Sequence, residues 1–539
     1  MEALDLLGEL WPVREGSHVG YSIESGSILS ERLNIFQRTH VFIGGAVVAR
    51  MLRTSSIDDY RTFLRARTSP VYRIRGHMLE VPDEYAWWLE SSSLPESDCQ
   101  PSPFLFDYQA GICEIAARKK KFAVFADCGL GKTLILLDFV KHVVQSRGGR
   151  VLIVSPLMVV PQTVQEAAKF YGDSLTIQQI PSSGLQDWMR DGSGVGITNY
   201  DAMTQDLRSH GLSGLVLDES SMLKSHYGKW GQQCIELGRG VEYKLALTGT
   251  PAPNDRIEYA NHAVFLDASK TVNEFLARYF VNRGQTDNRW EIKPHAIEPF
   301  YRDLSHWCIF LTNPATYGWH DNTEKLPPIH VSIDHVELSP EQSHAVQIET
   351  GGLFAGKPGG IGQRATLAQI GKGSWKGERI PTHKPSFIRS LVDSFGDEST
   401  IIWCHFNDEQ KQIAEQFPDA ANIDGSTQYE TRIRLIDEFK SGQRKVLISK
   451  PKILGFGLNL QVCTRMVFSG LQDSYESYYQ AVKRANRYGS TKPLYVHIPV
   501  TDIEIPMIET VLTKAQKVQS DTEAQERLFR SSMFGGSTC

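Results

Sequence analysis

Short runs of apolar, often β-branched residues alternate with longer amphipathic stretches over most of the chain. A first series of such runs lies between residues 122 and 247, and a second lies between residues 400 and 497. The first series comprises 122–125, 151–154, 195–198, 215–217 and 244–247, and the second comprises 400–403, 421–423, 445–448, 466–468 and 494–497. Strands that alternate with helical patterns indicate a parallel sheet with both faces covered. The pattern therefore predicts two α/β lobes in tandem.

The segments outside these two series complete the predicted domain organisation. Residues 1–95 carry mixed short patterns, and the Ser- and Pro-rich segment 91–103 indicates a linker. The Gly-rich piece 351–362 is typical of a mobile connection, and the charged helical pattern at 503–530 predicts a helix that packs back as a brace. We therefore expect a small N-terminal accessory domain at 1–95, a first lobe with a helical extension at 104–330, a connection at 331–384, a second lobe at 385–502, and a C-terminal bracing helix and tail at 503–539.

Composition restricts the class of protein without identifying it. A chain of 539 residues exceeds what one hydrophobic core usually supports. The net charge of −5 neither indicates nor excludes nucleic acid, because basic residues can line one groove of an acidic protein. The eight cysteines form no C-x-x-C pair, and no run reaches the ~18 apolar residues of a membrane span. We expect a protein of a reducing, cytoplasmic compartment, without structural zinc and without a membrane partner.

Residues 126–133 (ADCGLGKT) have the pattern of a phosphate-binding loop. They stand between an apolar strand pattern and an apolar helical pattern, which is the context that such a loop requires. Gly129 and Gly131 let backbone N–H groups face phosphate oxygens, and the helix that starts near Lys132 adds its positive dipole end. Lys132 should reach the β- and γ-phosphates, and Thr133 should reach a magnesium ion. An isolated match of this kind also arises by chance, so its neighbours matter.

Two carboxylates end the apolar run 215–217. Asp218 is placed to hold magnesium through its water shell, and Glu219 is placed to orient or deprotonate an attacking water. Alone, such a pair is also a common helix cap at a strand end. After the next strand, Thr248 and Thr250 put two hydroxyls near the expected γ-phosphate, although a Thr-Gly-Thr-Pro segment is by itself equally a turn.

Two further segments extend this candidate nucleotide site. Gln109 lies upstream of the loop, where its amide can read the edge of adenine. Far downstream, Gln480, Arg484 and Arg487 form a Gln-x-x-x-Arg-x-x-Arg pattern that can supply arginines from another domain. A site divided in this way predicts ATP and Mg²⁺ as the bound groups, and hydrolysis that depends on closing two domains.

The order of these motifs resembles that of superfamily-two helicases. The closer likeness is to their Swi/Snf-type branch, and it is carried by 326–328 (LPP), 424–427 (DGST), 455–461 (GFGLNLQ) and 480–489 (QAVKRANRYG). The amino-acid sequences of segments 125–133, 253–255 and 478–480 are most similar to those of compact DEAD/DEAH-type helicases of bacteriophages and prophages. The likeness covers about residues 104–515.

This resemblance implies an α/β fold of two RecA-like parallel-sheet lobes, with ATP in the cleft between them and nucleic acid across both. It implies that Arg484 and Arg487 complete the site from the second lobe, with Gln480 as a polar neighbour. Gly457 belongs to the loop that links the nucleotide to the nucleic-acid track. The residues implied to contact nucleic acid, or to couple it to ATP, are Ser155, Pro156, Thr198, Tyr200, Thr248, Thr250 and Asn459.

The function implied is an ATP-dependent DNA translocase or helicase that acts on duplex or branched DNA. Its partners would include phage or host replication and repair proteins in the cytoplasm of a bacterial cell. An ATP-dependent clamp or recruitment switch for a partner enzyme, and an RNA helicase, remain as alternatives. Ser220 and Ser221 follow Glu219 where the family usually has Ala-His or Ala-Asp. The Arg-rich stretch of large remodellers is missing at 310–315, which argues against chromatin-type remodelling.

The basic, aromatic-bearing stretch 61–75 has two interpretations. Its interleaved tyrosines and arginines suit a surface that binds a nucleic-acid strand. The same composition is typical of a solvated helix face.

Overall fold

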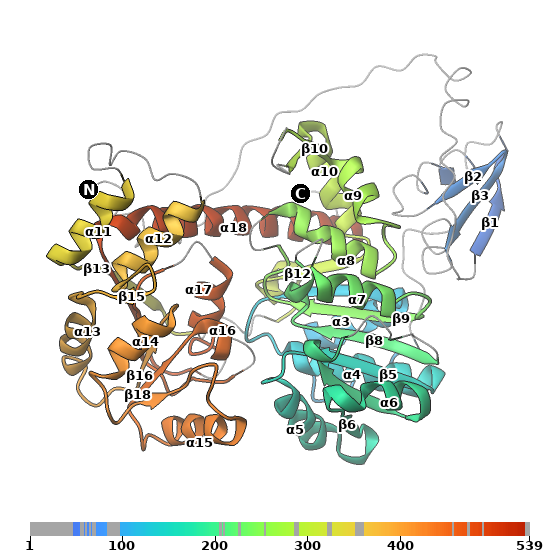
Figure 1. The fold of residues 1–539 in the computed structure, drawn as a ribbon. Helices are drawn as coiled ribbons and strands as arrows, with labels where there is room; N and C mark the ends of the chain where they lie inside the picture. Colours follow the sequence, from blue (N-terminus) through green and yellow to red (C-terminus); the bar gives the residue numbers. More distant parts are fainter. Residues whose placement is uncertain are drawn as a thin grey trace.

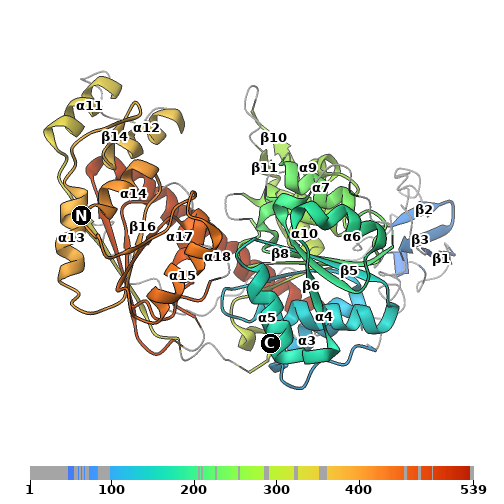
Figure 2. The same cartoon turned by 60° about the horizontal axis from the view of Figure 1, so that its bottom comes forward.

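We analysed a computed structural model of the chain. It describes residues 47–53, 59, 62–63, 66, 72–82, 98–203, 207, 211–224, 228–252, 255–284, 290–320, 326–350, 361–454, 458–471, 475–487 and 490–533. Two α/β lobes, each built on its own sheet, account for most of these residues (Figures 1 and 2). The prediction of two tandem lobes is therefore confirmed.

The first lobe is built on a parallel sheet of seven strands in the order β12-β4-β9-β8-β5-β7-β6. The strands are β4 (Lys121–Ala126), β5 (Arg150–Ser155), β6 (Ile177–Gln179), β7 (Val195–Asn199), β8 (Leu212–Asp218), β9 (Tyr243–Thr248) and β12 (Cys308–Leu311). Every strand run of the first series is confirmed. The pattern missed β6 and β12, which have only three and four residues.

Helices cover both faces of this sheet, because its central strands are apolar on both sides. In β4, Phe122 and Val124 pack into one core cluster while Ala123 and Phe125 pack into the other. The first face carries α3 (Asp107–Lys119), α4 (Lys132–Arg147) and α5 (Val160–Tyr171). The second face carries α6 (Leu185–Asp191), α7 (Lys229–Leu237), α8 (Tyr259–Phe265), α9 (Val272–Tyr279) and α10 (Ile297–Leu304). A short antiparallel pair, β10 (Phe280–Asn282) and β11 (Trp290–Ile292), stands beside α9.

The second lobe is built on a parallel sheet of six strands in the order β13-β20-β19-β16-β18-β17. The strands are β13 (Ile329–His335), β16 (Thr400–Trp403), β17 (Ala421–Asn422), β18 (Val446–Ser449), β19 (Arg465–Phe468) and β20 (Leu494–Val500). The helices packed on it are α13 (Lys384–Asp393), α14 (Asn407–Ala414), α15 (Tyr429–Lys440), α16 (Pro451–Leu454) and α17 (Tyr475–Val482). All strand runs of the second series are confirmed.

The boundary predicted between the lobes is corrected by β13. We assigned residues up to 330 to the first lobe and 331–384 to a connection, but β13 pairs with β20 along its whole length. Its alternation of apolar and polar residues suits an edge strand, and only the partner shows to which sheet it belongs. The remainder of the supposed connection holds α11 (Pro340–Thr350), α12 (Ile361–Gly371) and the hairpin of β14 (Ser374–Trp375) and β15 (Glu378–Arg379).

The chain ends in α18 (Ile505–Met533), a helix of 29 residues that extends along both lobes (Figure 1). Its first half contributes Ile508 and Val511 to the core of the second lobe. Its second half places Phe529 in the core of the first lobe. At 1.5 Å per residue the helix is about 43 Å long, enough to span both lobes. These contacts with both cores are those that a bracing helix would make.

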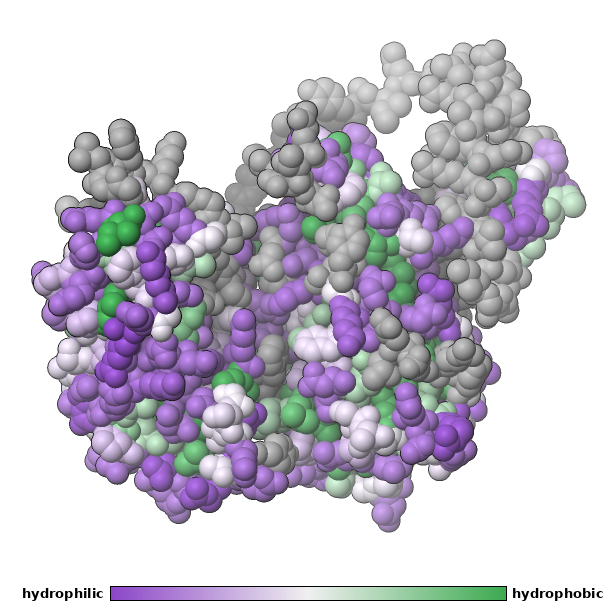
Figure 3. Space-filling model, viewed as in Figure 1, coloured by the Kyte–Doolittle hydropathy of each residue, from purple (hydrophilic) through white to green (hydrophobic). Residues whose placement is uncertain are grey.

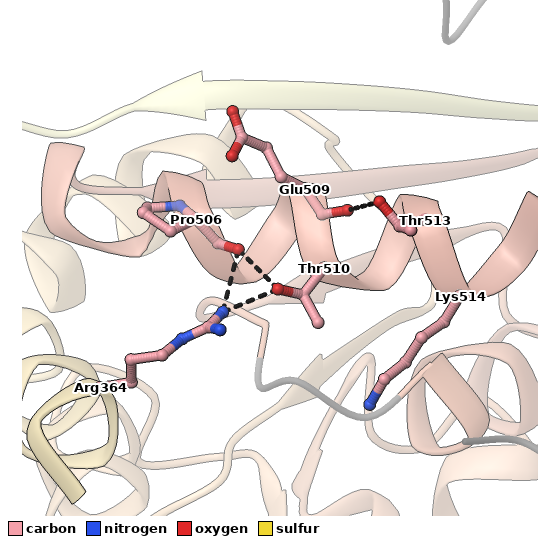
Figure 4. A pocket seen from close by; sticks show the side chains of 6 residues that line it. All are labelled: Arg364, Pro506, Glu509, Thr510, Thr513 and Lys514. Carbon is pink, nitrogen blue, oxygen red and sulfur yellow. Dashed lines mark hydrogen bonds between the residues drawn. The ribbon is translucent and has the colours of Figure 1, made fainter. Parts of the chain in front are cut away.

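Polar contacts join α18 to both lobes. The Nε of Arg256, in the first lobe, donates to both oxygens of Asp521 at 3.0 Å. On the second-lobe side, Arg364 of α12 donates to the carbonyl oxygen of Pro506 at 3.1 Å and to the hydroxyl of Thr510 at 2.7 Å (Figure 4). The helix therefore joins the lobes through side chains as well as through the backbone.

A small antiparallel sheet precedes the first lobe. It consists of β1 (Val47–Met51), β3 (Met78–Pro82) and β2 (Arg73–Arg75), in that order. Leu79 and Val81 form its core with Ala66. The carboxylate of Glu80 accepts a hydrogen bond from Arg73 Nε at 2.5 Å, so this cation of the 61–75 stretch is neutralised within the domain. This sheet lies inside the range 1–95, for which an accessory domain stays a prediction.

Hydrophilic residues predominate on the face shown in Figure 3, and the hydrophobic ones form small separate groups. None of the helices in the described part of the chain is both long and apolar enough to cross a membrane.

Candidate functional site

The candidate residues of the first lobe meet at one edge of its sheet. β4, β9, β8 and β5 are consecutive neighbours, and all of them run parallel. The carboxyl ends of parallel strands share one edge, which is where α/β sheets bind ligands. The loop that follows β4, Asp218 at the end of β8 and Thr248 at the end of β9 therefore lie together.

The loop after β4 has the backbone geometry of a phosphate cradle. Gly129 and Gly131 adopt φ values of +95° and +66°, in the left-handed region that favours glycine. The 16-residue helix α4 begins at Lys132, so its first N–H groups point toward the loop. Lys132 Nζ donates to the carbonyl oxygens of Ala126, at 2.8 Å, and of Asp127, at 3.2 Å. The lysine thus lies folded over the loop, and its cation is held where a phosphate would bind.

Gln109 lies directly against this loop. A Cβ added at Gly131 would come within 2.2 Å of Gln109 Nε2. The amide is engaged within the protein, because Nε2 donates to the carbonyl oxygen of Leu130 and Oε1 accepts from the N–H of Phe106. Gln109 therefore supports the loop from beneath in this conformation, and reading an adenine edge would require its amide to exchange one of these bonds.

Asp218 and Glu219 form a buried acidic pair. Asp218 Oδ2 accepts from the hydroxyl of Ser155 at 2.9 Å, and Oδ1 accepts from the N–H of Glu219 at 3.0 Å. Burial and the neighbouring charge of Glu219 raise the pKa of Asp218 to about 6. Lys132 acts in the opposite direction, which places its cation near the pair. A divalent cation would stabilise the ionised form of such a buried carboxylate. Asp218 therefore fits the role of a magnesium ligand.

Glu219 is held in a strained backbone conformation. Its φ of 51° and ψ of 52° lie in the left-handed region, which costs a non-glycine residue roughly 1–2 kcal/mol. This turn directs its carboxylate toward the end of β9, where Oε1 accepts from the hydroxyl of Thr248 at 2.7 Å. Ser221 donates to the same oxygen at 3.2 Å. The strain therefore coincides with a carboxylate placed at the strand edge.

The Ser-Ser departure from the family pattern has a direct structural role. Ser220 is hydrogen-bonded through its hydroxyl to Nε2 of the buried His262 at 2.9 Å. Burial lowers the pKa of His262 to about 4, so the ring is neutral at physiological pH. Ser220 thus contacts α8, and Ser221 contacts the acidic pair.

The loop after β9 packs between the acidic pair and the phosphate loop. The N–H of Thr250 donates to Thr248 Oγ1 at 3.1 Å, which holds the turn. At Gly249 an added Cβ would lie 3.4 Å from the carbonyl oxygen of Ala126 and 3.6 Å from Lys132 Nζ. Any larger side chain at Gly249 would therefore occupy space beside the lysine.

Helix α17 of the second lobe completes the site. Gln480 Nε2 donates to Glu219 Oε1 at 3.4 Å and to Thr250 Oγ1 at 3.2 Å, and it is only 3% exposed. Thr250 in turn donates to Glu476 Oε1 at 3.3 Å, and Lys224 forms an ion pair with the other oxygen of Glu476. Residues more than 220 positions apart in the chain are thus in direct hydrogen-bond contact.

The two arginines follow directly after α17. Arg484 is buried, and its carbonyl oxygen accepts from the N–H of Leu460 at 3.0 Å. Burial and the charge of Arg484 lower the pKa of Arg487, while Cys128 and Glu166 act in the opposite direction. Cys128 belongs to the phosphate loop and Glu166 to α5, so Arg487 lies within electrostatic range of the first lobe, while its Nη1 donates to the carbonyl oxygen of Leu458 in the second lobe at 3.4 Å.

A contact that our sequence analysis missed lies between the phosphate loop and α17. Asp127 Oδ2 accepts from Lys483 Nζ at 3.1 Å, and Asp127 Oδ1 accepts from the hydroxyl of Tyr479. Both partners lie inside the 480–489 motif or next to it. No spacing rule in the sequence pairs them with a residue more than 350 positions earlier.

Comparison with known proteins identifies both lobes. Residues 115–383 match the SNF2-related domain, and residues 383–489 match the helicase conserved C-terminal domain. The chain belongs to the superfamily-two helicases of the Swi/Snf type. Its two matched domains are those of ATP hydrolases, and the two parallel sheets are its RecA-like lobes.

The similar proteins include fission yeast and plant relatives. The chain is 22% identical to the SWI/SNF chromatin-remodeling complex subunit snf22 of Schizosaccharomyces pombe, over 72% of this chain and 26% of that protein. It is 21% identical to the ATP-dependent DNA helicase DDM1 of Arabidopsis thaliana, over 68% of this chain and 55% of that protein. The chain thus spans between a quarter and about half of the length of these two curated relatives.

Two solved structures are also similar. The Sulfolobus solfataricus SWI2/SNF2 ATPase core in complex with dsDNA covers 81% of this chain and 97% of its own, at 20% identity and a TM-score of 0.37. The S. cerevisiae Dbp5 bound to RNA and ADP BeF3 covers 78% of this chain and 93% of its own, at 15% identity and a TM-score of 0.47. At these scores the assignment rests on the sheets and the domain matches, and not on the superpositions.

Among the residues implied to contact nucleic acid, Thr248 and Thr250 are buried beside the acidic pair as described above, and the other five divide into two groups. Ser155, Thr198 and Tyr200 are buried, with their hydroxyls bonded to Asp218 Oδ2, to the carbonyl oxygen of Ile180 and to the carbonyl oxygen of Asp218. The side chains of Ser155 and Tyr200 hold Asp218, and that of Thr198 holds Ile180, so in this conformation all three hydroxyls are engaged within the lobe. A role of these residues in contacting nucleic acid stays a prediction.

The other group is more accessible. Pro156 is half-buried, and Asn459 is exposed with its amide bonded to Gln461 Oε1 at 3.0 Å. These two keep surface that a ligand can reach. Gly457 lies outside the described residues.

Proposed function

We propose that this protein is an ATP-dependent DNA translocase or helicase that hydrolyses ATP in the cleft between its two lobes. The observation that carries the proposal is the set of direct contacts across that cleft. Gln480 of the second lobe touches Glu219 and Thr250 of the first, at the edge where the phosphate loop and the acidic pair lie. Chemistry at this edge is therefore sensitive to the relative position of the lobes.

The residues of the first lobe would bind and orient the nucleotide. Lys132 leaves its carbonyl partners for the β- and γ-phosphates, while the N–H groups of the loop and of α4 receive phosphate oxygens. Magnesium, held by Thr133 and by Asp218, would neutralise charge on the phosphates. Glu219 orients the attacking water, and Thr248 holds the carboxylate in place.

The second lobe would make hydrolysis conditional on closure. Arg484 and Arg487 stabilise the charge that develops on the γ-phosphoryl group, and an arginine supplied in this way raises the rate by roughly 10³–10⁵. Gln480 precedes Arg484 on the same segment and donates a hydrogen bond to Glu219, so a movement of the arginines also changes a contact of that carboxylate. ATP binding would then favour the closed arrangement and product release the open one, which moves the lobes along a track.

DNA is the track that the family relationship favours. Two of the relatives are named as a chromatin-remodeling subunit and as an ATP-dependent DNA helicase. Contacts to phosphate and sugar carry little sequence information, so duplex or branched shape would decide the preference. The amino-acid sequences of segments 125–133 and 478–480 support a phage or prophage source. The protein would then act in the cytoplasm of a bacterial host, together with replication or repair proteins.

The test is a set of ATPase rates with Mg²⁺ on single-stranded, duplex and forked DNA and on RNA. We expect the largest stimulation by duplex or forked DNA, loss of hydrolysis in Lys132→Ala, and no change in Lys440→Ala, which removes an exposed lysine of α15. Displacement of a triplex strand would demonstrate translocation. Hydrolysis without displacement would favour the clamp, and a preference for RNA would reject DNA as the track.

A further inference from the structure

A single carboxylate connects the phosphate loop to the second lobe. Asp127 accepts from Lys483 at 3.1 Å and from the hydroxyl of Tyr479, and its Oδ1 also accepts from the N–H of Cys128 at 2.6 Å. The side chains of Asp127 and Lys483 are each 16% exposed. The pair is thus shielded from solvent on most sides, where charges interact more strongly than at a surface.

The position of this carboxylate is unfavourable for a loop that binds a polyanion. Asp127 follows Ala126, and its own carbonyl oxygen accepts from Lys132, the residue expected to reach the β- and γ-phosphates. An uncompensated negative charge there would repel the phosphates and draw Lys132 away from them. Lys483 removes this problem by supplying the compensating charge from the opposite lobe.

The electrostatic environment supports a standing ion pair. Burial acts to raise the pKa of Asp127, but Lys483 and the Tyr479 hydroxyl outweigh it and leave the pKa below its usual value. Burial likewise acts to lower the pKa of Lys483, and Asp127 outweighs it. Both groups are therefore charged at neutral pH.

The same contact fixes the register of the catalytic segment. Lys483 immediately precedes Arg484, and Tyr479 immediately precedes Gln480. A helical turn separates Tyr479 from Lys483, so one carboxylate holds two successive turns of the α17 segment. A shift of this segment along the phosphate loop would displace the arginines and Gln480 together.

We propose that Asp127, Tyr479 and Lys483 form an interlobe latch that positions Arg484 and Arg487 over the nucleotide and keeps the charge of Asp127 from opposing ATP. The latch rests on the proposed ATPase function and adds to it a set of positioning residues that contact the loop and not the substrate. It ties nucleotide affinity in the first lobe to a cation carried by the second.

The experiment is a double-mutant cycle of Asp127→Asn and Lys483→Met in the full chain. Both substitutions keep the approximate shape of the side chain and remove its charge. Steady-state ATPase gives KM and kcat, and a fluorescent methylanthraniloyl-ADP titration gives nucleotide affinity without hydrolysis. Lys483→Arg serves as the conservative variant, Lys440→Met as the matched surface control, and thermal melting checks that each variant is folded.

We expect Lys483→Met to raise KM about tenfold and to weaken methylanthraniloyl-ADP binding similarly, because the charge of Asp127 is then uncompensated. The double variant should return KM to within about twofold of the wild type, while kcat stays several-fold low because the arginines are less well placed. Lys483→Arg should retain KM. This rescue of KM by a second substitution is not expected of residues that only stabilise the fold.

The experiment distinguishes failure of the latch from failure of the proposed ATPase function. A wild-type protein that hydrolyses no ATP would reject the proposed function itself. A wild-type protein that is active while Lys483→Met keeps the wild-type KM and kcat would overturn the latch alone. Additive effects on KM in the double variant would also overturn it, because they would show that the two charges do not compensate each other.

Discussion

Replacing Glu504 by glutamine should destabilise the second lobe strongly. Glu504 is fully buried and bridges two buried lysines, with Oε1 accepting from Lys372 and Oε2 from Lys384, each at 2.6 Å. Oε2 also accepts from the N–H and the hydroxyl of Thr501, at 3.0 and 2.8 Å. These contacts link the residue after α12, the first residue of α13 and the turn 502–504 that leads into α18, so the carboxylate holds three segments together.

The stability that Glu504→Gln should lose follows from the charge state of this carboxylate. Burial acts to raise the pKa of Glu504, but the two lysines outweigh it and lower the pKa from 4.5 to about 2. A difference of this size corresponds to about 3 kcal/mol of stability at neutral pH. Removing the charge of a buried partner costs about 3–5 kcal/mol by a separate estimate, because the remaining cations stay buried. The two values agree.

The sign of the pH dependence follows from the lowered pKa. The contribution is complete above pH 4.5, where the carboxylate is ionised in both folded and unfolded states. It is lost as the pH falls from 4.5 toward 2. Glu504→Gln should therefore be less stable than the wild type at pH 7, with the difference shrinking over that acid range.

The assay is hydrogen exchange of the second-lobe amides, because two joined lobes do not unfold as one unit. Protection of the β16 and β19 amides should fall by about two orders of magnitude in Glu504→Gln. Glu509→Gln, an exposed glutamate five residues further on in the first turns of α18, is the matched control and should change this protection little. Equal protection in the two variants would refute the account of a bridging carboxylate.

Three further predictions concern other buried contacts. Gly470→Ala should lower the melting temperature and reduce stability by about 2 kcal/mol or more, because Gly470 has a φ of +132° and an added Cβ would lie 2.4 Å from Glu504 Oε1; an unchanged melting temperature would contradict the packing. Glu219→Gln should reduce kcat by at least about 100-fold in an ATPase assay while nucleotide binding persists, and a kcat near that of the wild type would exclude this carboxylate from the chemistry. Asp521→Asn should loosen α18 by about 2 kcal/mol, seen as faster exchange of its amides, since Asp521 binds Arg256 through both oxygens; the exposed Glu523→Gln is its control, and equal exchange in both would count against the brace.

The predicted strands were recovered because their runs are dominated by apolar residues that any partner sheet would bury. In β4, β8 and β16 almost every residue is buried, so local composition already determines that they lie inside an α/β core. The edge strand β13 was assigned wrongly for the opposite reason. Its half-buried, alternating sequence pairs with whichever edge is available, and β20 supplies that edge only in the folded chain.

The sequence by itself determined the chemistry available to this protein. The composition of 126–133, the Asp218-Glu219 pair and the 480–489 motif each specify a local conformation or a side chain, and local rules suffice to read them. The tertiary structure alone decided which groups meet. It turned Ser155 inward to Asp218 and joined Asp127 to Lys483 across the lobes, because long-range contacts depend on sheet order and lobe packing, on which local patterns carry no information.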